Sequence, residues 1–478
     1  MTTSRSAQIR AKLDHPVIDS DGHTLEFRPA LLDFVRAEGG PKLVERFEAL
    51  RADAWYRMSE AERARTRTIR PAWWGVPWKN TLDRATAALP ALLHSRLDDM
   101  GIDFAVLYPT ASLGFPHLGD EELRRALCRA VNTYHAEIYR EFSDRMAPVA
   151  LIPMHTPEEA IAELEYAVGH LGLKAVMMAS YVMRPHADGK GQWYDTLCLD
   201  SAYDYDPVWA KCIELKVSPT FHSNTKGVAS RSSISSYTFN HIGHFAASGE
   251  ALCKAAFLGG VTRRFPSLRM AFLEGGVGWG CSLYSDLVGH WKKRNRHTIQ
   301  DLNPDNLDRE RFWQLHRQYG GKLMAGRADD QATRDLALYI GTGNPIGPTV
   351  EDPAMLDEFA RCGIDSLEDV RKRFVPNFYF GCEADDPINA WAFDARKNPL
   401  GARLRAIFSS DIGHWDVPDM REVTAEAFEL VEDGHISEAD FRDFVFGNPL
   451  ALWTGTNPEF FKGTVVEAYY RDALGKNA

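Results

Sequence analysis

Carboxylate and imidazole side chains stand at the ends of several apolar segments of this chain, and such groups can bind a metal ion. Residues 17–23, VIDSDGH, place Asp21 and His23 two positions apart. Side chains two residues apart in a strand point to the same face, so both groups can reach one point. An Asp-x-His pair is also typical of a solvated turn after an edge strand. Its interpretation therefore depends on the residues that end the later strands.

Three later apolar segments end in His222, Glu274 and Asp411. Imidazole nitrogen and carboxylate oxygen suit a zinc or manganese ion, and three or four protein ligands leave a position open for water or substrate. Taken singly, His222 could be a hydrogen-bonded structural histidine, and Asp411 could be the N-cap of a following helix. Taken together, the pattern predicts one divalent ion, zinc or alternatively manganese, with the ligands Asp21, His23, His222 and Asp411.

From about residue 90 onwards, amphipathic helices alternate with short apolar strands. The eight strands that we predict are residues 17–23, 104–108, 148–152, 174–179, 217–222, 268–274, 377–383 and 405–411. Strands joined by helices in this way predict a parallel (β/α)8 TIM barrel of the α/β class. A doubly wound open sheet is the alternative. We favour the barrel because the ends of its strands surround one mouth, where the polar residues would meet.

Two stretches of the chain do not follow this alternation. A standard barrel needs about 250 residues, whereas this chain has 478. We therefore predict a single barrel domain, 1–478, with insertions at about 38–90 and 285–375 that cover the mouth or form a subunit interface. Trp73 and Trp74, in the first insertion, are predicted to cover an apolar or aromatic substrate. Tryptophans in insertions also seal subunit interfaces.

The composition limits the kinds of partner. The net charge of −11 argues against nucleic acid and anionic membranes, and favours a small-molecule substrate. No segment approaches 18 continuous apolar residues, and the first residues lack the apolar middle of a signal peptide, which predicts a cytoplasmic protein. The seven cysteines form no Cys-x-x-Cys pair, so neither a disulfide framework nor a thiolate zinc site is predicted. We also expect a homo-oligomer, a dimer.

The sequence resembles the amidohydrolase superfamily, in the branch that contains aminocarboxymuconate-semialdehyde decarboxylase and related hydrolases and decarboxylases. The segments that carry the resemblance are residues 17–23 with Glu26, 260–268, 274–276 with Trp279, 409–411 with His414, and 446–449. The resemblance implies a metal-dependent enzyme on a (β/α)8 barrel. It matches His222 to the metal ligand of strand five, and Asp411 to the strand-eight aspartate that binds metal and handles a proton.

The chain departs from the family pattern in three places. Asp21 stands where the family usually has histidine or glutamate. Relatives with two metals have a carboxylated lysine at the end of strand four, but residues 177–180 contain no lysine, which favours one metal. Decarboxylating relatives often have a histidine after strand six, where this chain has Glu274. The last difference favours hydrolysis over decarboxylation.

The function predicted from these residues is that of a metal-dependent hydrolase, in which a metal-activated water attacks a carbonyl-type bond of a small aromatic or apolar substrate. Asp411 would take the proton from that water. His241 and His244, in a predicted loop after strand five, or Glu274 would stabilise the oxyanion or protonate the leaving group. His414 is predicted to contact the substrate.

Several alternatives stay open at this point. The same ligands would serve a non-oxidative decarboxylase of an aromatic or unsaturated acid, or a barrel that binds a ligand without turnover. His241 and His244 could be histidines of a surface loop. Glu274 could be a buried carboxylate that pairs with an arginine such as Arg70 or Arg84.

Overall fold

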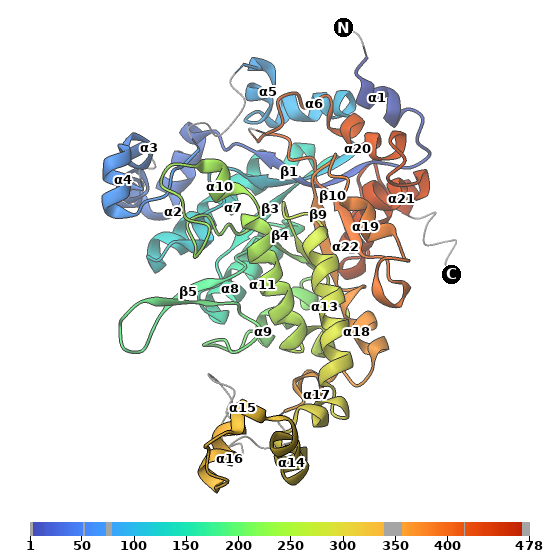
Figure 1. Cartoon of the computed structure of the whole chain (residues 1–478). Coiled ribbons are helices and arrows are strands. Elements are labelled where there is room, and N and C mark those ends of the chain that lie inside the picture. The colour runs from blue at the N-terminus through green and yellow to red at the C-terminus, as the bar shows by residue number, and fades with distance from the viewer. Residues whose placement is uncertain (1–2, 51–52, 73–78, 339–355, 415, 471–478) are drawn as a thin grey trace. The chain divides into compact units, whose positions relative to one another are not determined.

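Eight parallel strands form the central sheet of this computed structural model (Figure 1). Within the described residues the strand order is β1-β2-β3-β4-β7-β8-β9-β10. The strands are β1 Ile18–Thr24, β2 Phe104–Pro109, β3 Met146–Ile152, β4 Ala175–Met178, β7 Pro219–Phe221, β8 Met270–Phe272, β9 Phe378–Cys382 and β10 Arg405–Phe408. Helices surround this sheet, so the predicted (β/α)8 TIM barrel of the α/β class is confirmed.

The structure describes residues 3–50, 53–72, 79–338, 356–414 and 416–470. The chain divides into two compact units, one made of Met1–Ser285 with Arg371–Ala478 and the other of Asp286–Val370. The first unit contains all eight strands of the barrel. The second unit falls inside the range 285–375 that the sequence predicts as an insertion. Whether the two predicted insertions cover the mouth or a subunit interface stays a prediction.

Helices that lie between the strands or follow the last strand supply the outer layer of the barrel. They are α6 Pro90–Met100, α7 Glu121–Ile138, α8 Pro157–Leu164, α9 Asp206–Glu214, α11 His244–Leu258, α12 Val261–Arg264, α19 Asn389–Phe393, α20 Val423–Glu432, α21 Glu438–Arg442 and α22 Asn448–Thr456. The additional helices are α1 Arg5–Arg10, α2 Arg28–Ala49, α3 Asp53–Arg57, α4 Glu60–Thr66, α5 Thr81–Thr86, α10 Tyr237–His241, α13 Gly278–Arg294, α14 Arg309–Tyr319, α15 Gly321–Met324, α16 Gln331–Leu338, α17 Glu358–Arg361 and α18 Leu367–Phe374. None of the helices in the described part of the chain is long and apolar enough to cross a membrane.

Local sequence signals explain why helices and strands form where they do. The Asp120 side chain caps α7 by accepting a hydrogen bond from the Leu123 N–H. Two glutamates occupy the first turn, where their negative charges interact favourably with the helix dipole. Gly101, in left-handed conformation, ends α6. All residues of seven barrel strands are buried, and in β10 only Arg405 is partly exposed. Continuous apolar strands of this kind are expected in a parallel sheet that is covered on both faces.

The first and last strands of the barrel are joined by backbone and side-chain hydrogen bonds. The Asp411 N–H donates to the Asp21 carbonyl over 3.0 Å, and the His23 N–H donates to the Ile412 carbonyl over 2.7 Å. The buried Asp19 carboxylate accepts from the Ser410 N–H over 3.0 Å. These contacts close the barrel at the strands that carry predicted metal ligands.

All eight predicted strands are present, but most are shorter than predicted. Predicted strand 217–222 becomes Pro219–Phe221, and predicted strand 268–274 becomes Met270–Phe272. The polar residues that seemed to end these strands therefore lie in the turns directly after them. The strand pairing of β1 with β2 also shifts between Asp19 and Gly22, so Asp21 lies in a bulge. A bulge redirects a side chain, which simple alternation along a strand does not anticipate.

One feature of the barrel was not predicted. An antiparallel hairpin of β5 Val182–Pro185 and β6 Gln192–Asp195 follows β4. Arg184 in this hairpin donates to the Asp195 carboxylate over 2.6 Å and to the His155 carbonyl over 2.8 Å. These bonds fix the hairpin against the end of β3.

Candidate metal centre

Three donor atoms from β1 and from the turn after β7 form a compact triangle. Nε2 of His23 lies 3.2 Å from Nε2 of His222, and Oδ1 of Asp21 lies 3.6 Å from each of these two nitrogens. Donors bound to a tetrahedral ion at about 2.1 Å are about 3.4 Å apart. The triangle therefore has the dimensions that a divalent cation requires.

The burial of these groups also favours a cation. Asp21 is completely buried, and neither of its carboxylate oxygens accepts a hydrogen bond in the structure. A buried carboxylate without a partner is unfavourable, because it loses its hydration and gains nothing in return. A cation held by Asp21, His23 and His222 would supply the missing partner.

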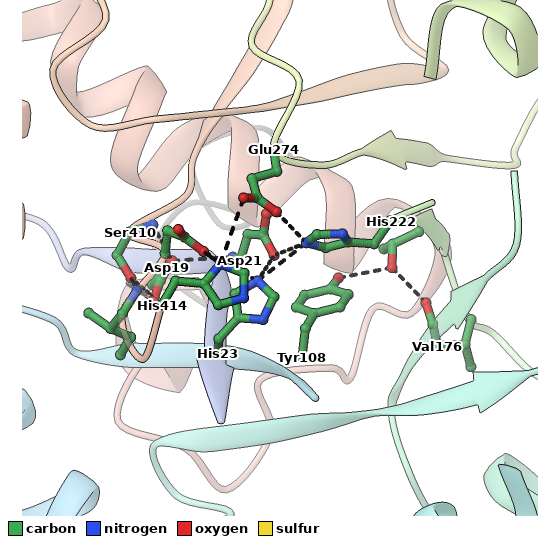
Figure 2. Close-up of polar contacts among 12 residues, drawn as sticks. Asp19, Asp21, His23, Tyr108, Val176, His222, Glu274, Ser410 and His414 are labelled. Carbon is green, nitrogen blue, oxygen red and sulfur yellow. Dashed lines mark hydrogen bonds and ion pairs between the residues drawn. The ribbon is translucent and has the colours of Figure 1, made fainter. Parts of the chain in front are cut away.

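A second set of donors lies beside the triangle (Figure 2). Oδ1 of Asp411 is 3.4 Å from Nε2 of His23 and 2.6 Å from Nδ1 of His414. Glu274 stands between the two sets: its Oε2 is 3.1 Å from Nε2 of His222, and its Oε1 is 3.7 Å from Nδ1 of His414. The His414 ring stacks on the His23 ring with 3.7 Å between centroids. The four predicted ligands and two further predicted site residues therefore meet at one place.

Glu274 and Asp411 share an unusual backbone conformation. Their φ angles are 52° and 53°, in the left-handed region that residues other than glycine rarely adopt. Such conformations cost about 1–3 kcal/mol each and persist where the surrounding structure holds them. The left-handed turns at these two residues place both carboxylates among the three imidazoles.

Further hydrogen bonds join the strands that carry the donor residues. The Ser410 hydroxyl donates to the Asp19 carboxylate over 2.5 Å, in addition to the backbone bond. The Tyr108 hydroxyl donates to Thr220 over 2.9 Å, and Thr220 donates to the Val176 carbonyl over 2.8 Å (Figure 2). The Tyr108 ring lies 6.1 Å from the ring of His23, measured between centroids. These bonds tie β1, β2, β4, β7 and β10 together under the donor atoms.

A cavity of about 280 Å³ opens beside Glu274 and is lined by His241, His244, Glu383 and Asp386, among others. The prediction that the two histidines lie in a loop is wrong. His241 ends α10 and His244 begins α11. His244 is only 1% exposed, and neither of its ring nitrogens has a hydrogen-bond partner. Its ring is therefore available to a molecule that enters the cavity.

The family model of the amidohydrolases matches residues 18–303, which is more than half of the chain. The chain belongs to the amidohydrolase family. This confirms the resemblance drawn from the sequence. The matched range includes β1 to β8 and four of the six donor residues described above, Asp21, His23, His222 and Glu274. Asp411 and His414, which follow β10, lie outside it.

Individual relatives of this amidohydrolase are distant. The decarboxylase orsB of Emericella nidulans is 32% identical over 97 residues, which are 20% of this chain and 25% of that protein. The chain thus aligns with about a quarter of the length of this curated relative. An amidohydrolase structure from Mycobacterium avium subsp. paratuberculosis K-10 has 16% identity and a TM-score of 0.49, over 92% of this chain and 100% of that one.

Two solved structures of decarboxylases are also similar. The 2,6-dihydroxybenzoate decarboxylase from Rhizobium has 15% identity and a TM-score of 0.46, over 92% of this chain and 99% of that one. A dihydroxybenzoic acid decarboxylase from Polaromonas sp. JS666, solved with bound manganese, has 16% identity and a TM-score of 0.47, over 94% and 99% of the two chains.

Burial and neighbouring charges shift the ionisation of the site in the metal-free amidohydrolase. Burial raises the pKa of Asp21 to about 7, although His222 opposes the shift. Burial, followed by the charge of Glu274, raises the pKa of Asp411 well above its usual value. Burial also acts to raise the pKa of Glu274, but His222 and His414 outweigh it and hold this pKa well below the usual value. Glu274 is therefore the ionised carboxylate that the imidazoles surround.

The histidines around the site differ in charge. Burial lowers the pKa of His23 well below its usual value and lowers that of His244 to about 2, so both rings are neutral at neutral pH. Burial acts to lower the pKa of His414 as well, but contact with Glu274 raises it overall. A neutral imidazole has a free lone pair, which is the form that binds a metal.

Three residues near the cavity were not predicted from the sequence. Glu383 directly follows β9, so the rule that singled out the other strand ends would have found it, and Asp386 lies in the turn after it. Burial, followed by the charge of Asp416, raises the pKa of Glu383 to about 7. Lys226 lies in the turn after β7 with its Nζ 5.4 Å from the centre of the Tyr237 ring, and burial lowers its pKa. No motif in the sequence marks Lys226.

Two of the alternatives left open by the sequence are wrong. Asp411 is not the N-cap of a following helix, because the next helix, α20, begins at Val423. Glu274 does not pair with Arg70 or Arg84: its ion-pair partners among the described residues are His222 and His414. Trp73 and Trp74 lie outside the described residues, so their predicted place over the substrate stays a prediction.

Proposed function

We propose that the protein is a metal-dependent carboxy-lyase that removes CO2 from a small aromatic or unsaturated carboxylic acid. The observation that carries this proposal is the buried triangle of Asp21, His23 and His222 with Asp411 beside it, because it provides a cation site next to a carboxyl group that can hold a proton. The 97-residue likeness to a fungal decarboxylase supports decarboxylation as the reaction. This choice reverses the preference for hydrolysis that we drew from the sequence.

The divalent ion, when bound, would supply Lewis acidity toward the substrate's carboxylate and a neighbouring oxygen. Asp21, His23 and His222 would hold the ion, and their fixed positions would orient the substrate above the barrel mouth. When the bond between carbon and carboxylate breaks, its electron pair stays on the carbon. Asp411, which burial keeps protonated in the metal-free protein, would donate its proton to that carbon. The products are CO2 and the substrate with hydrogen in place of the carboxylate.

A cavity that follows the first two strands suits an apolar group. This cavity, of about 1100 Å³, lies where the chain leaves β1 and β2, and its lining includes Leu25, Phe27, Phe47, Leu89 and Phe115. Phe27 and Leu89 are about half exposed, at 51% and 47%. Apolar surface of this kind is typical of small-molecule sites. It would receive the apolar part of an acid whose carboxylate points to the metal centre.

Hydrolysis of a carbonyl-type bond is the second candidate function. Glu274 favours it, because an ionised carboxylate beside the ion would accept a proton from an attacking water. In that reaction Asp411 would protonate the leaving group, and the neutral His244 ring would donate a hydrogen bond to the oxyanion. A hydrolase and a carboxy-lyase would use the same three residues to hold the ion.

The two reactions are distinguished by their products. The full-length protein, loaded with Mn²⁺ in D2O, would be incubated with a panel of aromatic acids, unsaturated acids, amides, esters and vinylogous diketones. Decarboxylation is expected to release CO2 and to place one deuterium on the carbon that carried the carboxylate. A product acid with no CO2 release would instead support hydrolysis. If a metal-stripped sample kept its activity, both proposals would fail.

The remaining expectations belong to the same proposal. We propose a small-molecule substrate, a homodimer in the cytoplasm, and zinc as the native ion in place of the manganese used in the assay. Tyr319 and Leu323 in the second unit are 74% and 75% exposed, which supports a subunit interface on α14 and α15. Light scattering of the full chain and of a Tyr319→Lys, Leu323→Lys variant tests the dimer, and metal analysis of protein from the native host tests zinc.

A further inference from the structure

A separate cavity, here called the distal cavity, lies at the end of the barrel where the strands begin. Its volume is about 260 Å³. Three of its lining residues mark its place: Phe104 is the first residue of β2, Met146 is the first residue of β3, and Lys174 directly precedes β4. The donor residues of the metal centre lie toward the opposite ends of the strands. The distal cavity is therefore not part of that centre.

The walls of the distal cavity are mainly apolar, and its charged groups are positive. The apolar side chains include Phe104, Met146 and Leu173. The charged side chains are Arg140 and Lys174, and no carboxylate is among the described residues that line the cavity. The whole chain, by contrast, carries a net charge of −11. A positive site of this kind attracts an anion.

Lys174 has donors to spare for such an anion. Its Nζ donates to the Phe460 carbonyl over 3.2 Å, which uses one of its three N–H groups. The side chain is partly buried, and burial lowers its pKa with no neighbouring carboxylate to oppose the shift. A desolvated ammonium group without an anionic partner is unfavourable. The carboxylate of a ligand would supply that partner.

His135 offers a hydrogen-bond acceptor in the wall formed by α7. Its Nδ1–H donates to the Val149 carbonyl over 2.9 Å, because a carbonyl can only accept. Burial lowers the pKa of His135 to about 4, so the ring is neutral and Nε2 carries a lone pair. The residue is 0% exposed and Nε2 has no hydrogen-bond partner. Buried polar atoms usually have one, and the hydroxyl group of a ligand would provide it.

The volume of the distal cavity limits the size of its ligand. Pockets that hold drug-sized molecules measure about 300–1,000 Å³. The distal cavity is smaller, and its apolar walls suit a flat ring. A single aromatic ring with one anionic substituent and one hydroxyl group matches its size and its polar groups.

We propose that the distal cavity is a second binding site, which takes a small hydroxyaromatic carboxylic acid. The carboxylate would pair with Lys174, and the hydroxyl group would donate to Nε2 of His135. The ring would pack against Phe104 and Met146. This site needs no metal ion, and it does not depend on the reaction proposed for the mouth of the barrel.

Titration calorimetry of the metal-free, full-length protein tests the proposal, because a mouth without its ion holds a carboxylate poorly. We expect one 4-hydroxybenzoate to bind per chain. Phenol lacks the carboxylate and should bind about 10- to 100-fold more weakly. Benzoate lacks the hydroxyl group and should bind more weakly by up to about tenfold. Hexanoate should bind more weakly than benzoate, because its flexible chain loses more conformational freedom.

Three variants make the test specific. Lys174→Met removes the charge, so it should weaken 4-hydroxybenzoate by about 10- to 100-fold and leave phenol unchanged. Lys254→Met removes a surface lysine of α11 that pairs with Glu250, and it should retain full affinity for both ligands. Ala136→Phe fills the distal cavity from α7 and should abolish binding of both. It replaces Lys174→Met if that variant does not melt cooperatively.

Two kinds of result would overturn the proposal. The site is wrong if 4-hydroxybenzoate does not bind, or if it binds Lys174→Met as tightly as it binds the unaltered protein. The ligand class is wrong if hexanoate binds more tightly than 4-hydroxybenzoate. Neither result bears on decarboxylation, which is tested by product release from the Mn²⁺-loaded protein.

Discussion

The backbone N–H of Asp411 donates a hydrogen bond to the backbone carbonyl of Asp21 over 3.0 Å. This bond joins the last strand of the barrel to the first, and it connects the two aspartates that the sequence predicts as metal ligands. Closure of the barrel and assembly of the metal centre therefore depend on the same contact. Mutations at this junction of the first and last strands, here called the seam, should affect stability and metal binding together.

Removal of the Ser410 hydroxyl should destabilise the seam. Ser410 donates to the buried Asp19 carboxylate through both its hydroxyl and its N–H. Ser410→Ala leaves a buried carboxylate with one partner fewer, which costs about 1–3 kcal/mol of unfolding free energy. Urea unfolding of the metal-free protein measures the loss. The control is Ser409→Ala: that hydroxyl is buried without a partner, so its removal should change stability little.

A methyl group at Gly413 should disrupt the approach of the last turn to β1. Gly413 has φ 94°, and a Cβ there would lie 2.6 Å from the carbonyl oxygen of His23. Gly413→Ala should therefore lower both the melting temperature and the bound Mn²⁺ per chain. Gly434 also has a positive φ, 72°, but a Cβ there meets nothing within 4 Å. Gly434→Ala should cost only the backbone strain, about 1–2 kcal/mol, and keep its metal. Equal effects of the two changes would contradict the prediction.

The pKa of Asp21 predicts how its contribution to stability varies with pH. Burial raises this pKa from 3.8 to about 7 in the folded, metal-free protein. Between these values the folded chain binds a proton that the unfolded chain has released, so this contribution falls as pH rises, by roughly 1.4 kcal/mol per pH unit. The stability of the unaltered protein relative to Asp21→Asn should therefore decrease from about pH 4 to about pH 7 and level off above.

Urea unfolding of both metal-free proteins across this pH range gives the difference directly. Buried groups away from Asp21 titrate equally in both proteins, so their effects cancel, whereas His222 loses the charge of Asp21 that raises its pKa and adds to the difference. Asp33→Asn is the matched control, since its side chain is 75% exposed and forms a surface ion pair with Arg36. A difference that stays flat, or that grows with pH, would show that Asp21 is not held protonated.

Loss of the His244 side chain should reduce turnover without loss of metal. Its ring is buried, has no hydrogen-bond partner and lines the cavity beside Glu274. A positioned neutral donor that stabilises an oxyanion in the transition state contributes about 10²–10³-fold to rate. His244→Asn should lower kcat by a factor in this range, while Mn²⁺ content and melting temperature stay unchanged. If kcat stays within tenfold of the unaltered enzyme, the ring has a structural role only.

Much of the barrel was predictable because its signals are local. The alternation of amphipathic helices with apolar strands depends on the spacing of neighbouring side chains, so all eight strands were found. Most predicted strands extend beyond the residues that form the strand in the structure. The hairpin of β5 and β6 was missed because its strands have only four residues each, mix apolar with polar side chains and are partly exposed, without a strong alternation. The bulge before Gly22 was also missed, since it arises from pairing with β2 and not from the sequence of β1.

By itself, the sequence determined the residue types that can bind a metal and the strand ends that carry them: Asp21, His23, His222 and Asp411 are chemically suited wherever the chain places them. Only the tertiary structure decided that Glu274 faces His222 and His414 and not an arginine, and that His414 stacks on His23. These relationships join residues far apart in the chain. They depend on how the strands close into a barrel and on two left-handed turns, and no spacing within one segment specifies either.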